Sequence, residues 1–241
     1  MLKINQLKVK IETKEILHDV TLVVKEGQVA ALMGQNGSGK STLAQSIMGH
    51  PAYSVVSGSI MFNDKELNDL TPTERSLAGV FLSFQYPSEV TGVTISSYLR
   101  MIHNKAHNTN VPPALFRKAL KEKMELLEIN EDFASRYLNE GFSGGEKKRM
   151  EMLQMLVLEP KIAILDETDS GLDVDALRVV SKAINYLKEK TNMSVLLITH
   201  YTRIFKYIEP DIVFVMQNGS IVKEGDKSLA HLIEEKGYAN V

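Results

Sequence analysis

The sequence predicts an α/β protein with a mainly parallel sheet, an antiparallel β subdomain and an inserted helical lobe. Apolar runs of strand length alternate with amphipathic helical patterns along much of the 241 residues, which is typical of a parallel sheet with helices on both faces. Between residues 86 and 158 the apolar runs disappear and helical spacing takes over. We therefore expect a single domain in which residues 1–85 and 159–241 form the α/β core and residues 86–158 form the helical lobe.

The N-terminal part is predicted to be rich in strands, the first of them antiparallel. The strand-like segments are Leu2–Val9, Leu17–Val24, Val29–Met33, Ser59–Phe62 and Val80–Phe84. A helix is expected over Ser41–Met48, because a glycine and a proline follow it. A second, short helix opens at Thr71, which has a proline after it and Glu74 three positions later. This spacing predicts a capping box.

In the predicted lobe, apolar residues recur at helical spacing at Phe116, Leu120, Met124 and Leu127. The C-terminal part after the lobe returns to the α/β pattern. The later strand-like runs are Ile162–Leu165, Val195–Thr199 and Ile212–Met216. A crossover helix between the first two is predicted from the apolar stripe Leu177, Val180, Ile184 and Leu187. Asn218-Gly219 is a strong hairpin signal, so the sheet is expected to finish with Ser220–Val222.

The composition argues against several classes of function. A net charge of −2 gives none of the basic character that nucleic-acid binding requires, so no nucleic-acid partner is expected. Cysteine is absent, which excludes disulfides and thiolate ligands and argues against secretion. No apolar run is long enough to span a bilayer, and Met1–Asn5 does not begin a signal peptide. We expect a cytoplasmic protein without direct membrane insertion.

A phosphate-binding loop is the most specific motif. It fits the pattern G-x-x-x-x-G-K-[S/T] and lies between a predicted strand and a predicted helix, where backbone N–H groups can surround a phosphate. Its residues are Gly34, Gln35, Asn36, Gly37, Ser38, Gly39, Lys40, Ser41 and Thr42. We expect Lys40 to bridge the β- and γ-phosphates of a nucleotide and Ser41 to coordinate Mg²⁺.

Paired acids end the buried strand Ile162–Leu165. Asp166 and Glu167 follow four apolar residues, at the carboxyl edge of the sheet where α/β proteins bind ligands. Asp166 is expected in the Mg²⁺ shell, and Glu167 as the base that positions the attacking water. Without the phosphate loop, a solvated acidic turn would be the favoured explanation of the pair.

Ser143-Gly144-Gly145-Glu146 opens a further predicted helix. Ser143 and Glu146 have the spacing of a capping box, and many such matches are capping boxes and nothing more. The two glycines cost roughly 1 kcal/mol each in helix propensity. That cost is explained if another group must approach the backbone closely, and a helix N-terminus with exposed N–H groups binds anions.

In this order, the three motifs resemble those of the nucleotide-binding domain of ABC ATPases, and the resemblance extends over essentially the whole chain. It implies a P-loop NTPase core that hydrolyses Mg-ATP to ADP and phosphate. It also implies a transient head-to-tail homodimer that closes on ATP. In that dimer Ser143 and Gly145 of one chain would contact the γ-phosphate bound to the other.

The resemblance assigns further residues. Gln85, after the strand Val80–Phe84, would join the Mg²⁺ and water network, and His200 would contact the γ-phosphate as the switch histidine. Ser170–Asp173 matches the loop that crosses the dimer interface, although Asp173 is also a good N-cap. One position departs from the family pattern. Ile11 stands where an aromatic residue usually stacks on adenine, and the first 52 residues contain no aromatic side chain, so we expect an aliphatic contact with the base.

Within ABC ATPases, four segments resemble the SufC family, the soluble ATPases of iron–sulfur cluster assembly. They are Phe84–Val93, Gly141–Arg149, Leu165–Asp173 and the tail, in its stretches Ile221–Asp226 and Glu234–Tyr238. This resemblance implies soluble scaffold partners similar to SufB and SufD, gripped through Tyr86–Thr94 and the helix near Phe116–Leu127. The alternative is the ATP-binding subunit of an ABC membrane transporter.

The basic run Lys147-Lys148-Arg149 has two interpretations. It is expected either to form a solvated helix face or to provide a cation, Lys148, that pairs with Glu167 in the isolated monomer and holds the base out of place.

Overall fold

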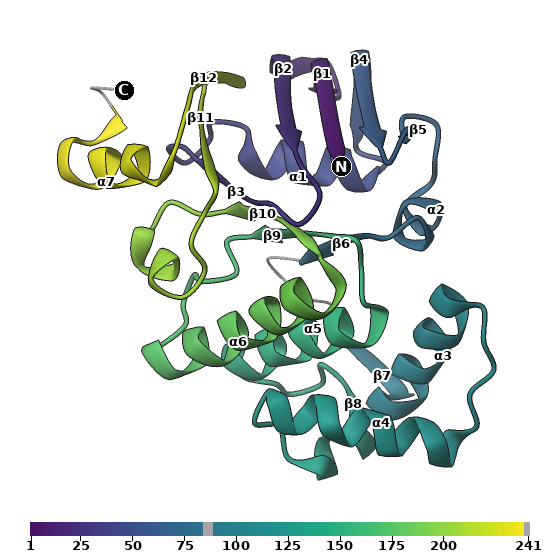
Figure 1. Ribbon diagram of the computed structural model, residues 1–241. Coiled ribbons are helices and arrows are strands. Elements are labelled where there is room, and N and C mark those ends of the chain that lie inside the picture. Colours follow the sequence, from purple (N-terminus) through teal and green to yellow (C-terminus); the bar gives the residue numbers. More distant parts are fainter. Residues whose placement is uncertain (84–88, 239–241) are drawn as a thin grey trace.

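The computed structural model describes residues 1–83 and 89–238, which form two large sheets, a two-stranded pair, a helical region and the connections between them (Figure 1). The first sheet is antiparallel and has the strand order β2-β1-β4-β5. Its strands are β1 (Leu2–Ile11), β2 (Lys14–Val24), β4 (Tyr53–Phe62) and β5 (Lys65–Glu66). The expected antiparallel β subdomain is therefore confirmed, and both predicted N-terminal strands are longer than their apolar residues indicated.

The second sheet has six strands in the order β12-β11-β3-β10-β9-β6. Its strands are β3 (Val29–Met33), β6 (Val80–Ser83), β9 (Ile162–Asp166), β10 (Ser194–Ile198), β11 (Ile212–Gln217) and β12 (Ser220–Gly225). All neighbours pair in parallel except β11 and β12, which form the hairpin predicted at Asn218-Gly219. The mainly parallel α/β core is confirmed.

Both faces of the central sheet are covered, which is why β3 is apolar at every position. Ala30 and Leu32 face a core shared with α1 (Lys40–Met48) and the antiparallel sheet. Ala31 and Met33 face α7 (Lys227–Lys236). The edge that carries the carboxyl ends of the parallel strands stays accessible for the loops that follow them.

Two longer helices lie beneath the central sheet in Figure 1. They are α5 (Gly144–Leu158) and α6 (Val174–Thr191), which pack on each other and on strands β9 and β10. The predicted stripe Leu177, Val180, Ile184 and Leu187 is buried there. The short helix α2 (Pro72–Leu77) begins at Thr71 with a complete capping box, as predicted.

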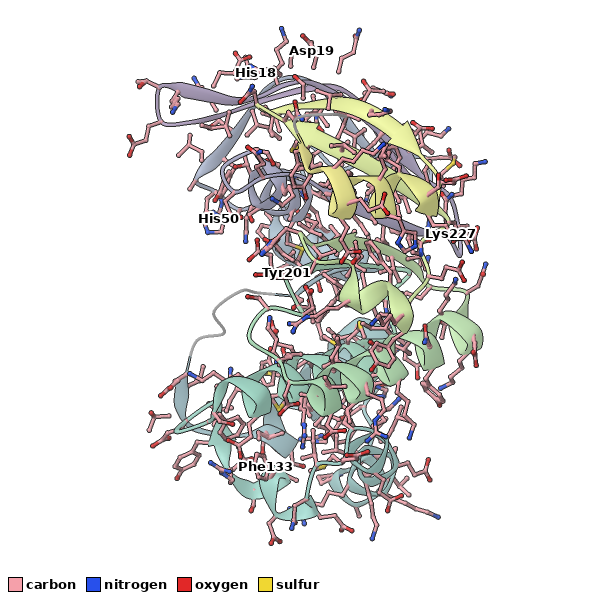
Figure 2. The ribbon with its side chains drawn as sticks, turned by 90° about the vertical axis from the view of Figure 1, so that its left-hand side faces the viewer. His18, Asp19, His50, Phe133, Tyr201 and Lys227 are labelled. Atoms are coloured by element: carbon pink, nitrogen blue, oxygen red, sulfur yellow. The ribbon has the colours of Figure 1, made fainter. Side chains whose placement is uncertain are left out.

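The segment between β6 and α5 is mostly helical and lies at the end of the molecule opposite the antiparallel sheet (Figure 1). It contains α3 (Ile95–His107), α4 (Pro113–Leu126) and the 3₁₀ turn η1 (Glu131–Ser135). It also contains a small antiparallel pair, β7 (Val90–Thr94) and β8 (Tyr137–Leu138), which the helical periodicity did not predict. We retain residues 86–158 as a proposed lobe. The side view places Phe133 at this end, His18 and Asp19 at the opposite end, and Tyr201 between them (Figure 2).

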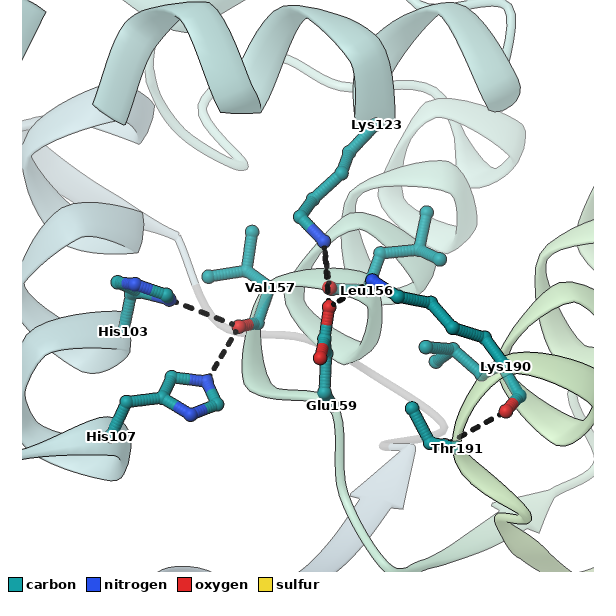
Figure 3. Close-up of polar contacts among 9 residues, drawn as sticks. His103, His107, Lys123, Leu156, Val157, Glu159, Lys190 and Thr191 are labelled. Atoms are coloured by element: carbon teal, nitrogen blue, oxygen red, sulfur yellow. Dashed lines mark hydrogen bonds and ion pairs between the residues drawn. The ribbon is translucent and has the colours of Figure 1, made fainter. Parts of the chain in front are cut away.

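The junction between the helical segment and the core is tied by one carboxylate (Figure 3). Glu159 ends α5 in the left-handed region, with φ 45°. Its side chain pairs with Lys123 of α4 at 3.1 Å and with Lys190 of α6 at 2.9 Å. His103 and His107 of α3 face the carbonyl of Val157 on the neighbouring turn. Helices from both regions therefore meet at the C-terminal end of α5.

A last 3₁₀ turn, η2 (Thr202–Lys206), follows β10. Within residues 1–83 and 89–238, no helix combines the length and the apolar character that crossing a bilayer demands.

Candidate active site

The phosphate loop connects β3 to α1 at the carboxyl edge of the central sheet, as predicted. Two of its glycines adopt positive φ, 79° at Gly37 and 110° at Gly39, which side chains rarely tolerate. Gly34 is required for a different reason. A Cβ atom there would lie 2.4 Å from the carbonyl oxygen of Met216 and 2.7 Å from the Ser38 hydroxyl. The β11–β12 hairpin holds the other side of the loop, because the Gly219 N–H donates to the Ser38 carbonyl at 2.8 Å.

Lys40 lies almost completely buried under this loop. Its ammonium donates to the carbonyls of Gly34 at 2.8 Å and Gln35 at 3.0 Å. Burial lowers the pKa of Lys40, and the neighbouring carboxylates of Glu167 and Asp166 oppose that shift. The structure therefore brings the predicted lysine and the predicted acid pair together.

Asp166 ends β9 beside the start of α1. The Ser41 hydroxyl bonds to its carboxylate, so the two predicted Mg²⁺ ligands are neighbours. Burial raises the pKa of Asp166, and the bond from Ser41 opposes the rise. Its Oδ1 atom is buried and has no hydrogen-bond partner among the described residues. A buried carboxylate oxygen without a partner is a position where a cation would be expected.

Glu167 and His200 follow β9 and β10, two adjacent parallel strands, so they emerge at the same edge. The Glu167 Oε1 atom lies 3.4 Å from His200 Nδ1, and both side chains are mostly buried. Glu167 has φ 48°, a strained value for a residue with a side chain. Its N–H bonds to the carbonyl of Ile198 at 2.9 Å, which fixes that conformation. Strain held in place by neighbouring structure is common at functional sites.

A buried acid in the next loop was missed by the sequence analysis. Asp169 is 1% exposed, and the Thr199 hydroxyl lies 3.1 Å from both of its carboxylate oxygens. The Arg203 guanidinium pairs with the Asp169 carboxylate and donates to the Asp169 backbone carbonyl. Burial raises the pKa of Asp169, and the bond from Thr199 opposes the rise. The partners are about 30 residues away along the chain, so no local pattern indicated them.

The loop Ser170–Asp173 continues from this acid to the start of α6. Asp173 caps the helix, accepting from the Ala176 N–H at 2.7 Å, so the N-cap prediction is confirmed. Gly171 and Val174 are exposed, and the Val174 side chain is 69% accessible.

The basic run on α5 differs from the prediction of a solvated face. Lys148 is buried and pairs with Glu151 at 2.9 Å, whereas Glu167 contacts His200. Glu151 also accepts from Ser83 at the end of β6, at 3.1 Å. The expected pairing of Lys148 with Glu167 is therefore corrected: helix α5 turns Lys148 toward a carboxylate one turn along the same helix. Burial of this side of α5 on β6 and β9 makes that pairing necessary.

Ser143 begins α5 with the predicted capping box. Its N–H donates to Glu146 Oε2 at 2.8 Å, and the Glu146 N–H donates to the Ser143 hydroxyl at 3.3 Å. Gly144 is exposed and Gly145 is partly buried, and a Cβ atom at either would meet nothing within 4 Å. No contact within the described chain therefore requires these glycines.

Two further residues were expected from the sequence. Gln85, with Phe84 and Tyr86–Ser88, lies outside the described residues. Ile11 ends β1 in the antiparallel sheet and is partly buried.

Residues 17–170 match a family model described as ABC transporter. The chain belongs to the ABC transporter ATPase family. As an ABC ATPase it binds ATP and hydrolyses it. The matched region includes the phosphate loop, Ser143 and the acid pair, and extends from β2 to the loop after β9.

Curated relatives are similar over nearly their whole length. The chain is 49% identical over 242 residues to a probable ATP-dependent transporter, ycf16, of Cyanophora paradoxa, covering 99% of this chain and 93% of the relative. It is 51% identical over 243 residues to a probable ABC transporter ATP-binding protein of Streptococcus pyogenes, covering 100% and 94%. It is 51% identical over 239 residues to vegetative protein 296 of Bacillus subtilis, covering 98% and 91%.

Solved ABC ATPase structures share the fold. One is an ATP-binding cassette in a dimeric post-hydrolysis state with ADP and phosphate. It has TM-score 0.81 and 22% identity, covering 94% of this chain and 98% of that one. The ATP-binding subunit of an ABC transporter has TM-score 0.81 and 26% identity, covering 100% and 95%. The fold predicted from the sequence is thus shared with known members of the family.

Proposed function

We propose that ATP binds with its phosphates in the loop Gly34–Thr42 and that Glu167 is the base for hydrolysis. The support is the cluster at the carboxyl edge of the sheet, where Lys40 lies close enough to both acids to be affected by their charge. Glu167 would orient a water molecule for in-line attack and accept its proton, while the bond between the γ-phosphorus and ADP breaks. Lys40 and His200 would stabilise the charge on the transferring phosphoryl group.

Mg²⁺ fits the oxygen atoms at the end of β9. The Ser41 hydroxyl and the orphaned Asp166 Oδ1 are hard oxygen ligands, the type that Mg²⁺ prefers. Gln85 is a further candidate ligand outside the described residues. When bound, the cation would neutralise phosphate charge.

Each complete site would require two chains. Ser143 is exposed and Gly145 is partly buried, with nothing within 4 Å of a Cβ atom placed on the glycine, and such a helix N-terminus suits a phosphate from outside the chain. The solved relative in its post-hydrolysis state is dimeric. We propose that these two residues complete the ATP site of a second copy, in a homodimer that closes on ATP.

Subunit complementation tests this composite site. Lys40→Ala and Ser143→Arg would each inactivate both sites of their own homodimer. A mixed dimer would contain one intact site, so mixing the two inactive variants is expected to restore ATPase activity. A mixture as inactive as its components, under conditions where wild-type dimers exchange subunits, would exclude the two-chain site.

For the biological role, we propose the ATPase subunit of an iron–sulfur cluster assembly complex, of the SufC type, in the cytoplasm. The observation that carries the proposal is the segment Leu165–Asp173, in which Asp169 stands where transporter ATPases usually have an uncharged residue. In this chain the Asp169 carboxylate accepts a hydrogen bond from Thr199 and pairs with Arg203. The absence of cysteine agrees with a subunit whose partners supply the cluster ligands. Those partners would be soluble scaffolds similar to SufB and SufD, deformed by ATP-dependent dimerisation.

A second candidate is the ATP-binding subunit of an ABC membrane transporter, because two of the relatives named above are described as transporter proteins. Affinity purification of the chain under anaerobic conditions separates the two. Recovery of soluble partners rich in Cys or His supports cluster assembly. Recovery of a protein with several membrane spans would overturn the assignment to cluster assembly and support the transporter subunit.

A further inference from the structure

The C-terminal end of the described chain lies against the phosphate loop, although the two are far apart in sequence. Helix α7 covers β3 and β11 with Leu229, Ala230 and Ile233. Gly237 then reverses the chain with φ 71°, donating its N–H to the Ile233 carbonyl at 2.8 Å. Tyr238 packs on the same apolar cluster, and its carbonyl accepts from the Gln217 side chain at 3.0 Å. Figure 1 shows α7 beside the β11–β12 hairpin.

Two buried hydroxyls flank Gly34, the first residue of the loop. The Ser38 hydroxyl has no hydrogen-bond partner among the described residues. The Tyr238 hydroxyl has no partner of regular geometry there, and its one contact is with the Gly34 backbone, which opposes the rise in its pKa. The Ser38 oxygen is close to the Gly34 α-carbon, and the Gly34 backbone amide lies beside the Tyr238 hydroxyl. Burial raises the pKa of Tyr238, so its hydroxyl keeps its proton as a donor at neutral pH. Buried hydroxyls without partners are uncommon, and two at one turn require an explanation.

The same turn borders a cavity of about 260 Å³. Its lining residues are Gln35, Asn36, Gly37, Ser38, Gln217, Asn218 and Tyr238. The leading turn of the loop therefore has space on one side, and Tyr238 belongs to the lining of that space. A small shift of the turn would not meet packed side chains.

The donors and acceptors under the loop show why such a shift would matter. The Lys40 ammonium has three N–H donors, and the carbonyls of Gly34 and Gln35 already take two of them. If Lys40 bridges the β- and γ-phosphates, its three donors face four acceptors. One loop carbonyl then loses its donor. The hydroxyls of Tyr238 and Ser38, which lie nearby without acceptors, can replace it.

We propose that Tyr238 is a positioning residue for the phosphate loop. Its ring supports the Gly34–Ser38 turn, and its hydroxyl stabilises the arrangement of that turn when Lys40 engages the phosphates. Tyr238 does not touch the reacting atoms, and it acts through the backbone of the loop. The proposal rests on the assignment of Gly34–Thr42 as the ATP site.

Tyr238→Phe tests the hydroxyl and keeps the ring. Because the hydroxyl lacks a regular partner in the nucleotide-free chain, its loss is expected to leave the melting temperature without ATP unchanged or slightly raised. The affinity for ATP is expected to fall by roughly three- to tenfold, the effect of one hydrogen bond. KM for ATP should rise by the same factor with kcat unchanged, since the interaction is equal in the ground and transition states. Tyr186→Phe, on the exposed face of α6, is the matched control.

Gln217→Ala provides an independent test, because it releases the Tyr238 carbonyl while leaving the hydroxyl in place. Hydrogen exchange over residues 34–39 in the ATP-bound protein should become faster in both variants. Wild-type affinity and unchanged exchange in Tyr238→Phe would overturn the role of Tyr238. If Lys40→Ala binds ATP as tightly as the wild type, the assignment of the loop itself fails, which is a distinguishable result.

Discussion

Replacing Lys148 by methionine removes one member of a buried pair within α5, whose other member, Glu151, accepts a hydrogen bond from Ser83 of β6. The side chains of Lys148 and Glu151 are 10% and 3% exposed, and their charged atoms lie 2.9 Å apart. Unit charges at that separation attract by about 6 kcal/mol at an effective dielectric constant of about 20. Desolvation cancels much of this gain when both partners are present. With Lys148 absent, the buried Glu151 carboxylate keeps its desolvation cost and loses the compensating charge.

The expected loss of stability for Lys148→Met is therefore about 3–5 kcal/mol. For a chain of this length, a loss of about 3 kcal/mol lowers the melting temperature by roughly 6–12 °C. Urea denaturation and thermal unfolding of the nucleotide-free protein measure the effect. Lys147→Met is the matched control, because Lys147 forms a more exposed pair with Glu89 and should change stability by less than about 1 kcal/mol.

The double variant Lys148→Met/Glu151→Leu decides whether the pair is the cause. Removing both charges should recover most of the stability lost in Lys148→Met. If the two single losses simply add, the pairing is not the origin of the effect. ATPase activity of Lys148→Met well below its melting temperature should not exceed that of the wild type, because Glu167 contacts His200 instead. A rise would restore Lys148 as a restraint on the base.

Three further predictions concern the site. Glu167→Gln should reduce hydrolysis by roughly 100-fold or more while retaining ATP binding, measured by phosphate release and by equilibrium binding; rapid turnover would remove Glu167 from the role of base. Asp166→Asn should raise the melting temperature of the nucleotide-free protein at neutral pH and abolish hydrolysis. Because burial raises the pKa of Asp166, the wild type loses stability as the pH rises from the ordinary carboxyl pKa to the raised one, so the higher melting temperature of Asp166→Asn should vanish in acid. A difference in melting temperature that does not depend on pH would contradict this. Ser143→Ala and Thr71→Ala each break a capping box, and each should lower the free energy of unfolding by about 1 kcal/mol. Only Ser143→Ala should reduce ATPase activity. Equal losses of activity in the two variants would show that Ser143 acts only as a helix cap.

The reliable sequence predictions were those with a local physical cause. The spacing of Thr71 and Glu74, and of Ser143 and Glu146, was enough to identify both capping boxes, because each bond joins residues three positions apart. Asn218-Gly219 identified the hairpin for the same reason. The phosphate loop was recognisable because its residue pattern is contiguous, and two of its glycines serve backbone conformation within the loop.

The failures involve partners that are distant in sequence. From the sequence, Lys148 was expected in a solvated basic run, because nothing nearby in the sequence indicates that this face of α5 packs on β6. Asp169 reads as one acid of a loop, since Thr199 and Arg203 join it only when β9 and β10 lie side by side. The pair β7–β8 was missed because its strands are short and separated by two helices.

The sequence by itself determined the fold class, the phosphate loop, the acid pair and both helix caps, because each depends on backbone geometry within a few residues. Only the tertiary structure decided which charges are buried and what they face. It placed Glu167 beside His200, turned Lys148 to Glu151, and brought Tyr238 from the far end of the described chain to Gly34. The physical reason is that burial and Coulomb interactions depend on distances in space, which the folding of the chain sets.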